Sequence, residues 1–231
     1  MSRDIYTGLA GAAATWTQLE VLSGNVANTS TAGYRSGKVA FQLAGSNEGV
    51  LGKSYAEPTR VYADRSDGPV HHDGDPLHVA LQGDGFLALG GGQGATLLSR
   101  DGRMHLDPEG RLTHGSGLLV LGERGPIDVP AGETIRIAED GTVFGSESGE
   151  LDRLLLLTGT VEPVGGNLWE STGVTSPASV RVVQGAVEGS NVDPVASMVE
   201  LVEASRYFEA FQKAMQTSDE LDTRLNQVGR R

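Results

Sequence analysis

The chain has 231 residues, a formal net charge of −12, 5% aromatic residues and no cysteine. The length allows one or two domains, and the acidic charge argues against a basic surface for nucleic acid. Without cysteine there are no disulfides. No stretch approaches the roughly 18 apolar residues of a membrane span, so we expect neither nucleic acid as a partner nor membrane insertion.

The first segment has the pattern of an amphipathic helix, because its apolar residues recur at steps of three and four. This stripe consists of Ile5, Leu9, Ala12, Trp16, Leu19, Leu22 and Val26. Asn28 tolerates the left-handed conformation found after many helices, and the turn formers Thr31 and Gly33 follow. We therefore predict an N-terminal axial helix within residues 1–32 that ends near Asn28.

The middle of the chain changes in character. Residues 33–69 are polar and dotted with glycine, so we expect an extended linking segment there. Short apolar runs follow, and they predict strands at 77–81, 86–89, 103–106, 118–121, 127–129, 134–138, 142–144 and 154–157. Asp-Gly or Glu-Gly pairs beginning at 84, 101, 109 and 140 supply the positive φ of tight hairpins. Many short strands with such turns predict a central all-β antiparallel domain over 70–183.

The last segment, 184–231, contains a second predicted helix. Asp193 suits its N-cap and Pro194 its first turn. The apolar stripe of this helix consists of Met198, Leu201, Ser205, Phe208, Phe211, Met215, Ser218, Leu221 and Leu225. Because isolated helices are marginally stable, each stripe needs a partner, and two matched stripes favour a pairing in cis or between subunits. We predict an α+β fold in which the N- and C-terminal helices form a coiled-coil-like helical domain.

Short motifs are spread over nearly the whole chain. They are Asn25-Val-Ala-Asn28, Thr31-Ala-Gly33-Tyr34-Arg35, the segment 75–86, Arg100-Asp-Gly, Gly122-Glu-Arg-Gly-Pro126-Ile, Asp140-Gly-Thr-Val, the segment 183–192, and Arg206-Tyr-Phe-Glu209 leading to Gln216-Thr-Ser-Asp-Glu220. In this order they resemble the bacterial flagellar rod and hook family of axial proteins. Within the family, Arg3-Asp-Ile-Tyr6 and the short length look most like the proximal rod subunit. A distal rod or hook-type protein is the alternative.

The resemblance implies a structural subunit of the flagellar basal-body rod in the periplasm. Such a subunit polymerises with other rod proteins and with copies of itself through its terminal helices, and it transmits torque for motility. The segment Met1-Ser-Arg-Asp-Ile-Tyr-Thr-Gly8 lacks the apolar region of a cleaved signal peptide. The family relationship implies export through the flagellar type III apparatus instead.

We expect the assembly interface to lie on the two helical stripes and on the turn after the first helix. The predicted interface residues are Ile5, Leu9, Trp16, Leu19, Asn25, Asn28, Gly33, Tyr34, Met198, Leu201, Phe208, Phe211, Met215, Leu221 and Leu225. The helices are expected to become ordered as they pack against neighbouring subunits, because each stripe is then covered.

Support for catalysis is weak. The pair His71-His72 near Asp73 could bind a stray divalent ion, but its spacing matches no helical ligand pair. The aspartates of the turns at 84, 101 and 140 could act as paired carboxylates on a glycoside, although the turns already explain them. We therefore expect no cofactor, no metal and no enzymatic activity. A peptidoglycan-acting enzyme is the alternative from another class, and an adhesin with a helical stalk is a third.

Overall fold

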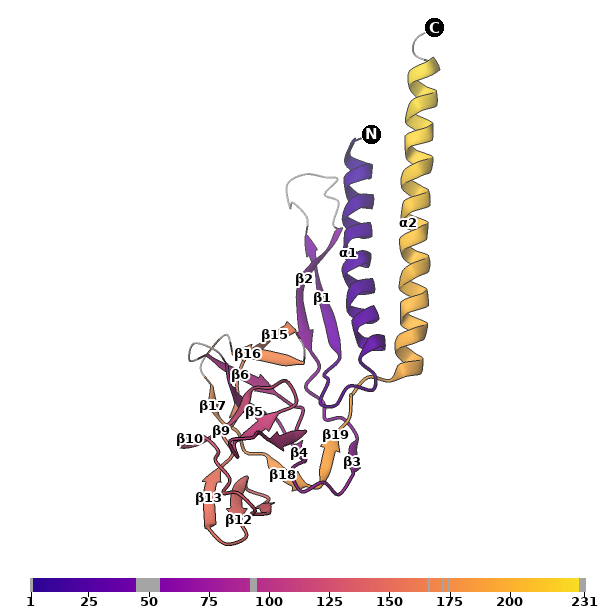
Figure 1. Ribbon diagram of the computed structural model, residues 1–231. Coiled ribbons are helices and arrows are strands. Elements are labelled where there is room, and N and C mark those ends of the chain that lie inside the picture. Colours follow the sequence, from indigo (N-terminus) through magenta and orange to yellow (C-terminus); the bar gives the residue numbers. More distant parts are fainter. Residues whose placement is uncertain are drawn as a thin grey trace. The chain divides into compact units, whose positions relative to one another are not determined.

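The computed structural model describes residues 2–44, 55–91, 95–165, 167–171, 173 and 175–228 (Figure 1). The chain forms two compact units. The helix–hairpin unit comprises Met1–Ala27, Gly37–Asp64 and Asp193–Arg231, and the β unit comprises Asn28–Ser36 and Arg65–Val192. The chain therefore passes from one unit to the other four times.

The helix–hairpin unit consists of two helices and a two-stranded antiparallel sheet. Its elements are α1 (Ser2–Ala27), β1 (Gly37–Ala44), β2 (Tyr55–Ala63) and α2 (Pro194–Val228). Figure 1 shows α1 between the hairpin and α2, and α1 packs against both strands as well as against α2. Thus residues from the beginning, the first third and the end of the chain build one unit.

The predicted start of α2 is confirmed in detail. Asp193 is its N-cap, since one carboxylate oxygen accepts hydrogen bonds from the backbone N–H groups of Val195 at 2.9 Å and Ala196 at 3.0 Å. Pro194 occupies the first helical position, where its missing N–H costs nothing.

The end of α1 differs in one respect from the prediction. The helix ends at Ala27, next to Asn28. However, among the residues described, Asn167 alone combines a side chain with a positive φ, so Asn28 does not adopt the left-handed conformation. Instead the Asn28 carbonyl accepts a hydrogen bond from the Thr31 N–H at 3.1 Å, and its side-chain oxygen accepts one from the Thr31 hydroxyl at 3.0 Å.

The α+β class fits the structure, but the predicted coiled-coil-like helical domain is wrong. The unit that contains the helices also contains the β1–β2 hairpin, which covers part of α1. Moreover, α2 has 35 residues against 26 in α1, so α1 cannot cover its whole length. The stripes showed that each helix needs a partner, but they did not show that a strand pair is one of the partners of α1.

The β unit is built from short antiparallel strands. They are β3 (Val70–His72), β4 (Val79–Gln82), β5 (Phe86–Gly90), β6 (Thr96–Ser99), β7 (Met104–Leu106), β8 (Leu112–His114), β9 (Leu119–Gly122), β10 (Gly125–Pro126), β11 (Ile135–Ile137), β12 (Thr142–Gly145), β13 (Gly149–Arg153), β14 (Leu156–Thr158), β15 (Val161–Gly165), β16 (Leu168–Ser171), β17 (Ser176–Pro177), β18 (Arg181–Gln184) and β19 (Ala186–Glu188). The main sheet follows the order β15-β16-β6-β5-β9-β8-β7, β10 pairs with β9, and β14 joins β5 to β17. Separate sheets are formed by β11-β12-β13, by β4 with β18, and by β3 with β19.

The core of the β unit is apolar and continuous. Its fully buried residues include Val79, Leu81, Leu87, Leu89, Leu112, Val120, Val143 and Val182. Most predicted strands lie within a few residues of an observed one. The exception is 127–129, where Ile127 is a buried core residue outside any regular strand and Asp128 makes a single bridge to Arg111.

The predicted turn glycines fall into two groups. Gly110 and Gly141 have positive φ, as expected for tight hairpins. The glycines of the pairs beginning at 84 and 101 do not have positive φ. A Cβ atom at Gly85 would lie 2.6 Å from the Ala178 side chain, and one at Gly102 would lie 1.8 Å from the Val79 carbonyl oxygen. These two positions therefore need glycine because there is no space for a side chain.

Candidate assembly site on the terminal helices

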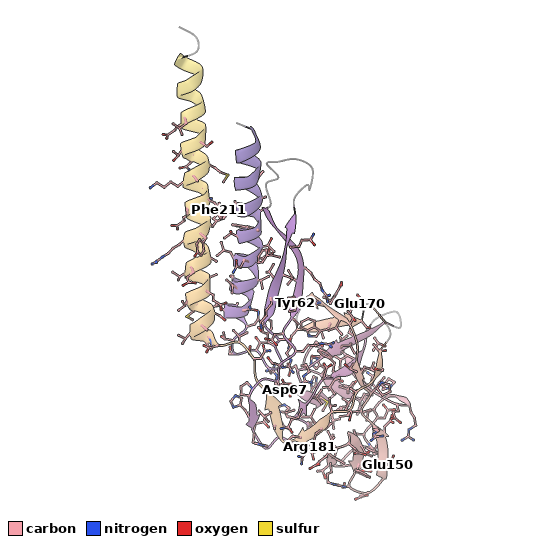
Figure 2. The ribbon with its side chains drawn as sticks, turned by 180° about the vertical axis from the view of Figure 1, so that it is seen from behind. Tyr62, Asp67, Glu150, Glu170, Arg181 and Phe211 are labelled. Carbon is pink, nitrogen blue, oxygen red and sulfur yellow. The ribbon has the colours of Figure 1, made fainter. Side chains whose placement is uncertain are left out.

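One face of α2 packs against α1 within the helix–hairpin unit. The Trp16 and Phe208 rings lie 5.6 Å apart between centroids and are tilted by 50°. Phe211, labelled in Figure 2, lies so close to Gly11 that a Cβ there would be 2.8 Å from its ring. Met215 approaches Gly8 in the same way at 3.6 Å. Small residues on α1 therefore let the aromatic side chains of α2 come close.

Other apolar residues of the two helices remain exposed. On α1, Leu9 is 54% and Trp16 is 59% exposed. On α2, Met198 and Leu221 are more than half exposed, whereas Leu201 is half-buried. Leu19 is also half-buried. The side chains of Ile5 and Leu225 lie outside those that the structure describes.

The beginning of α2 carries a second apolar face, of which the sequence stripe included only Met198. Val195, Met198, Val199 and Val202 follow the spacing i, i+3, i+4, i+7 and are all more than half exposed. Ala204, Phe208 and Phe211 lie on a different side, and Ala204 is buried. The three valines form a short periodic run that can be recognised in the sequence, but the longer apolar stripe on the same helix was the stronger signal.

Asn25, a predicted interface residue, has a role within its own unit. It is buried, its amide group donates a hydrogen bond to the Gly37 carbonyl at 2.9 Å, and its side-chain oxygen accepts one from the Gly37 N–H at 2.8 Å. This pair of bonds attaches the last turn of α1 to the first residue of β1. Asn25 thereby fixes the hairpin against the helix.

Gly33 and Tyr34 lie in the β unit. Gly33, predicted as a turn former, has a φ of +64°, and a Cβ there would be 2.4 Å from the backbone of Arg100 and Asp101. Its N–H donates to the Glu188 carbonyl at 2.8 Å. Tyr34 is half-buried, and burial raises the pKa of its hydroxyl. Asn28, at the start of the same loop, also belongs to the β unit.

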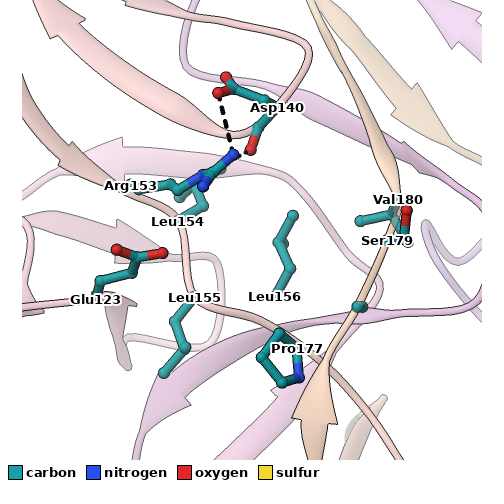
Figure 3. Close-up of a pocket in the computed structure, with 10 residues that line it drawn as sticks. Glu123, Asp140, Arg153, Leu154, Leu155, Leu156, Pro177, Ser179 and Val180 are labelled. Atoms are coloured by element: carbon teal, nitrogen blue, oxygen red, sulfur yellow. Dashed lines mark hydrogen bonds and ion pairs between the residues drawn. The ribbon is translucent and has the colours of Figure 1, made fainter.

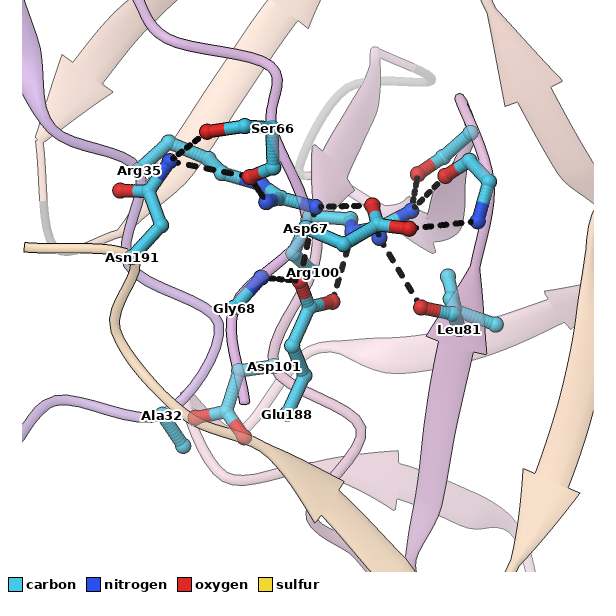
Figure 4. A network of polar contacts seen from close by, with 12 residues as sticks. Ala32, Arg35, Ser66, Asp67, Gly68, Leu81, Arg100, Asp101, Glu188 and Asn191 are labelled. Carbon is cyan, nitrogen blue, oxygen red and sulfur yellow. Dashed lines mark hydrogen bonds and ion pairs between the residues drawn. The ribbon is translucent and has the colours of Figure 1, made fainter. Parts of the chain in front are cut away.

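Next to this loop, the β unit contains a network of buried charges that the sequence analysis missed (Figure 4). The Glu188 carboxylate is 1% exposed, and it accepts from Arg35 at 2.8 Å and from Arg100 at 2.9 Å. Asp67 pairs with both arginines as well, at 3.1 Å and 3.0 Å. Burial lowers the pKa of Arg100, and the charge of Glu188 opposes that effect. The network joins segments that are far apart in the sequence.

A signal for these residues was present in the motifs. Arg35, Arg100 and Glu188 each lie inside a motif that carried the family resemblance. A charged residue within a glycine-rich motif is a candidate for a buried ion pair, because only a partner makes its burial tolerable.

A cavity of about 440 Å³ in the β unit is a candidate for a small-molecule site (Figure 3). Its walls include Leu154, Leu156 and Val180, and Glu123, Asp140 and Arg153 supply its charges. Hydrogen bonds from Thr142 lower the pKa of Asp140, and its ion pair with Arg153, at 3.1 Å, acts in the same direction. A general acid needs a raised pKa, so Asp140 is poorly suited to act as the general acid of a glycosidase.

Other chemical features are explained locally. Asp101 binds Arg103, and Asp84 contacts Arg65 and Thr158. Within the described ranges, no group of three or more His, Cys, Asp or Glu side chains could hold a metal ion. Among the helices as far as they are described, none is long and apolar enough to cross a membrane.

The pH dependence of the β unit is expected to follow His114, which is buried. Its Nδ1 accepts from the Ser116 N–H at 3.0 Å, and its Nε2 lies 3.3 Å from the Ser99 hydroxyl. Burial lowers the pKa of His114, so the unfolded chain binds a proton more readily than the folded one. The stabilising contribution is complete above the ordinary histidine pKa of about 6.5 and is lost as the pH falls below it.

Urea unfolding between pH 7.5 and pH 5 measures this effect. The wild-type free energy of unfolding should fall toward the acidic end. The variant H114Q, which cannot gain the proton, should show a smaller fall, although it is less stable throughout. Equal slopes for the two proteins would contradict the assignment.

Helices with exposed apolar faces, formed by the first and last segments of a chain whose middle folds as a β unit, are typical of a subunit that assembles with other proteins. Three family models match the chain: Flagella basal body rod protein at 5–35, Flagellar hook protein FlgE/F/G D1 domain at 80–145, and Flagellar basal body rod FlgEFG protein C-terminal at 183–228. The flagellar basal-body rod protein FlgF of Salmonella typhimurium is 34% identical, with 99% of this chain and 98% of the relative covered. FlgF of Escherichia coli is also 34% identical over the same shares, and FlgG of Bacillus subtilis is 26% identical over 96% of this chain and 97% of its own length.

The chain therefore belongs to the family of flagellar basal-body rod proteins. It is a structural subunit of the rod in the flagellar basal body, and it assembles with other flagellar axial proteins. The resemblance found in the sequence is confirmed.

Proposed function

We propose that this chain occupies the proximal part of the rod and joins its neighbours through the exposed apolar faces of α1 and α2. The identity of 34% to two FlgF proteins, against 26% to FlgG of Bacillus subtilis, supports the proximal position. Its role is mechanical, without a catalytic step. It reaches the rod through the flagellar export apparatus.

The exposed side chains of the two helices carry this proposal. Leu9 and Trp16 on α1, and the face formed by Val195, Met198, Val199 and Val202 on α2, are each more than half exposed. Covering one such side chain contributes on the order of 1 kcal/mol. Several of them together, repeated in every subunit, stabilise an assembly that a single contact would not hold.

The two faces differ, which matters for the form of the assembly. A contact between unlike faces is head-to-tail, and it produces an open helical array when the rotation does not close a ring. A rod is such an array. The predicted interface residues Phe208, Phe211 and Met215 support the assembly indirectly, because they lie on the side of α2 that meets α1. Leu201, seven residues before Phe208, lies on the same side of the helix.

The variant V199D tests the proposal. Because Val199 is 54% exposed, a carboxylate there remains hydrated in the free subunit, and the melting temperature should stay within a degree or two of wild type. In the assembled rod the same carboxylate loses its hydration, which costs several kcal/mol. Cells that carry only V199D should lack completed rods and swimming, as seen by electron microscopy and on soft agar.

The matched control is E203Q, an exposed position of α2 that flanks the apolar face and already carries a charge. It should assemble and support swimming normally. Motile cells that carry V199D at normal protein levels would remove this face from the interface. A large loss of melting temperature in V199D would show that the residue acts within the free subunit.

A further inference from the structure

The cavity of the β unit has an apolar floor and opens at the surface. Leu154 and Leu156 are buried in its floor, and Val180 is half-buried beside them. Glu123 and Ser179, which also line it, are exposed, so they mark its mouth (Figure 3). A volume of about 440 Å³ is within the usual range of ligand pockets.

The charges around this cavity do not balance. Asp140 and Arg153 are paired at 3.1 Å, and the Arg153 guanidinium also donates to the Asp140 carbonyl at 3.1 Å. The backbone N–H of Glu123 donates to the Arg153 carbonyl at 2.9 Å, but the Glu123 carboxylate makes no ion pair with a side chain that the structure describes. The cavity therefore suits a group that combines an apolar body with a positive charge.

A surface with this chemistry lies on the β1–β2 hairpin of the helix–hairpin unit. A Cβ at Gly37 would lie 3.0 Å from the Val21 side chain, so this position of β1 faces α1. Successive residues of a strand alternate between its two faces, so Lys38 and its cross-strand neighbour Tyr62 lie on the other face. Tyr62, labelled in Figure 2, is 41% exposed, and Arg60 is exposed two positions earlier on the same face. This face therefore presents an aromatic ring beside a guanidinium group.

Arg60 is the unbalanced charge of the hairpin face. Lys38 is paired with Asp64 at 2.5 Å, whereas Arg60 makes no ion pair with any side chain in the described parts of the chain. The register of the two strands shifts next to Arg60, between Ala40 and Phe41 of the opposite strand. Such a bulge bends a strand and re-aims the neighbouring side chains, and bulges are frequent next to functional sites.

We propose that the Arg60–Tyr62 face of one copy docks on the β-unit cavity of the next copy, with the Tyr62 ring over the apolar floor and Arg60 paired with Glu123. The two surfaces are unlike and every copy carries both, so the contact is head-to-tail and can repeat without closing. A second copy supplies the required apolar body and positive charge without any further component. The inference rests on the proposed function, because it adds a contact between copies to an assembly whose other contacts lie on α1 and α2.

Reversal of the two charges tests the pairing. R60E places a carboxylate against Glu123, and E123R places a guanidinium against Arg60, so each single variant should reduce the diameter of swimming rings on soft agar to about half of wild type or less. The double variant R60E/E123R restores opposite charges and should return the diameter to near that of wild type. Both positions are exposed, so the melting temperatures should not change. The control R60E/E150R, which reverses an exposed carboxylate outside the cavity lining, should remain defective.

Disulfide formation identifies the partner. The chain has no cysteine, so A40C, opposite Arg60 on the hairpin, and S179C, at the cavity, can be introduced without other changes. A disulfide requires Cα atoms within about 7 Å of each other. Rods isolated from motile cells that carry A40C/S179C should therefore yield disulfide-linked dimers and longer ladders of this chain after oxidation. The control A40C/A131C, whose second cysteine is exposed but outside the cavity lining, should remain monomeric.

Rods that support swimming but give no dimers with A40C/S179C would overturn this contact and leave the proposed function intact. A disulfide within one chain, or to a different protein, would overturn it too, because the occupant of the cavity would not be a second copy. The same holds if R60E/E123R swims no better than the single variants, since Arg60 and Glu123 would then not be partners. The proposed function fails on a separate result, which is swimming by cells that carry V199D at normal protein levels.

Discussion

The variant G33V should leave the β unit unfolded or nearly so. A Cβ at this position would lie 2.4 Å from the backbone of Arg100 and Asp101, and backbone atoms cannot rotate away as a side chain can. A β-branched residue is also strained at a φ of +64°. Together these effects should cost about 4 kcal/mol or more, which is a large part of the stability of a typical domain.

Gly132 provides the control for backbone strain alone. It has a φ of +86°, but nothing lies within 4 Å of the position of its Cβ. The variant G132V should therefore lose only about 1–3 kcal/mol. Urea unfolding followed by tryptophan fluorescence compares the two, since Trp169 is buried in the β unit. Equal losses would show that the close approach at Gly33 is not important.

The variant E188Q should have the second-largest effect. It removes the negative charge between Arg35 and Arg100, which are both buried. The two guanidinium groups would then face each other with Asp67 as their shared carboxylate, and Asp67 is 44% exposed. Removing one partner from such a buried group typically costs 3–5 kcal/mol. Thermal unfolding of the β unit measures this loss.

An exposed ion pair supplies the comparison. Glu139 and Arg181 are paired, but both are more than half exposed. Such pairs contribute little, so E139Q should leave the melting temperature almost unchanged. If E188Q is as mild as E139Q, the buried network does not stabilise the unit.

The sequence predicted those features that depend on neighbouring residues. The N-cap at Asp193, the end of α1 at Ala27 and most short strands follow from local spacing and turn chemistry. Gly33 was predicted as a turn former for the same reason, and it has a positive φ. In each case the residues that determine the structure lie within a few positions of one another.

Features that depend on distant residues were not predicted. The β1–β2 hairpin lies in a polar stretch whose strands are recognisable mainly by their packing on α1. The buried network requires Arg35, Asp67, Arg100 and Glu188 to meet, and no local pattern indicates that they do. The interface stripe on α2 mixed residues that face α1 with residues that are exposed, because periodicity identifies a side of a helix but not what covers it.

The buried network also bears on when the protein can fold. Ser36 and Asn191 are hydrogen-bonded although they are 155 positions apart, and Arg35 and Glu188 close the same loop. Contacts between such distant residues form late and slow the folding of a chain. Whichever end emerges first from a narrow conduit, one partner of each pair is still inside until most of the chain has passed. On the export route that we propose, the β unit would therefore be unable to complete its fold until nearly the whole chain has passed.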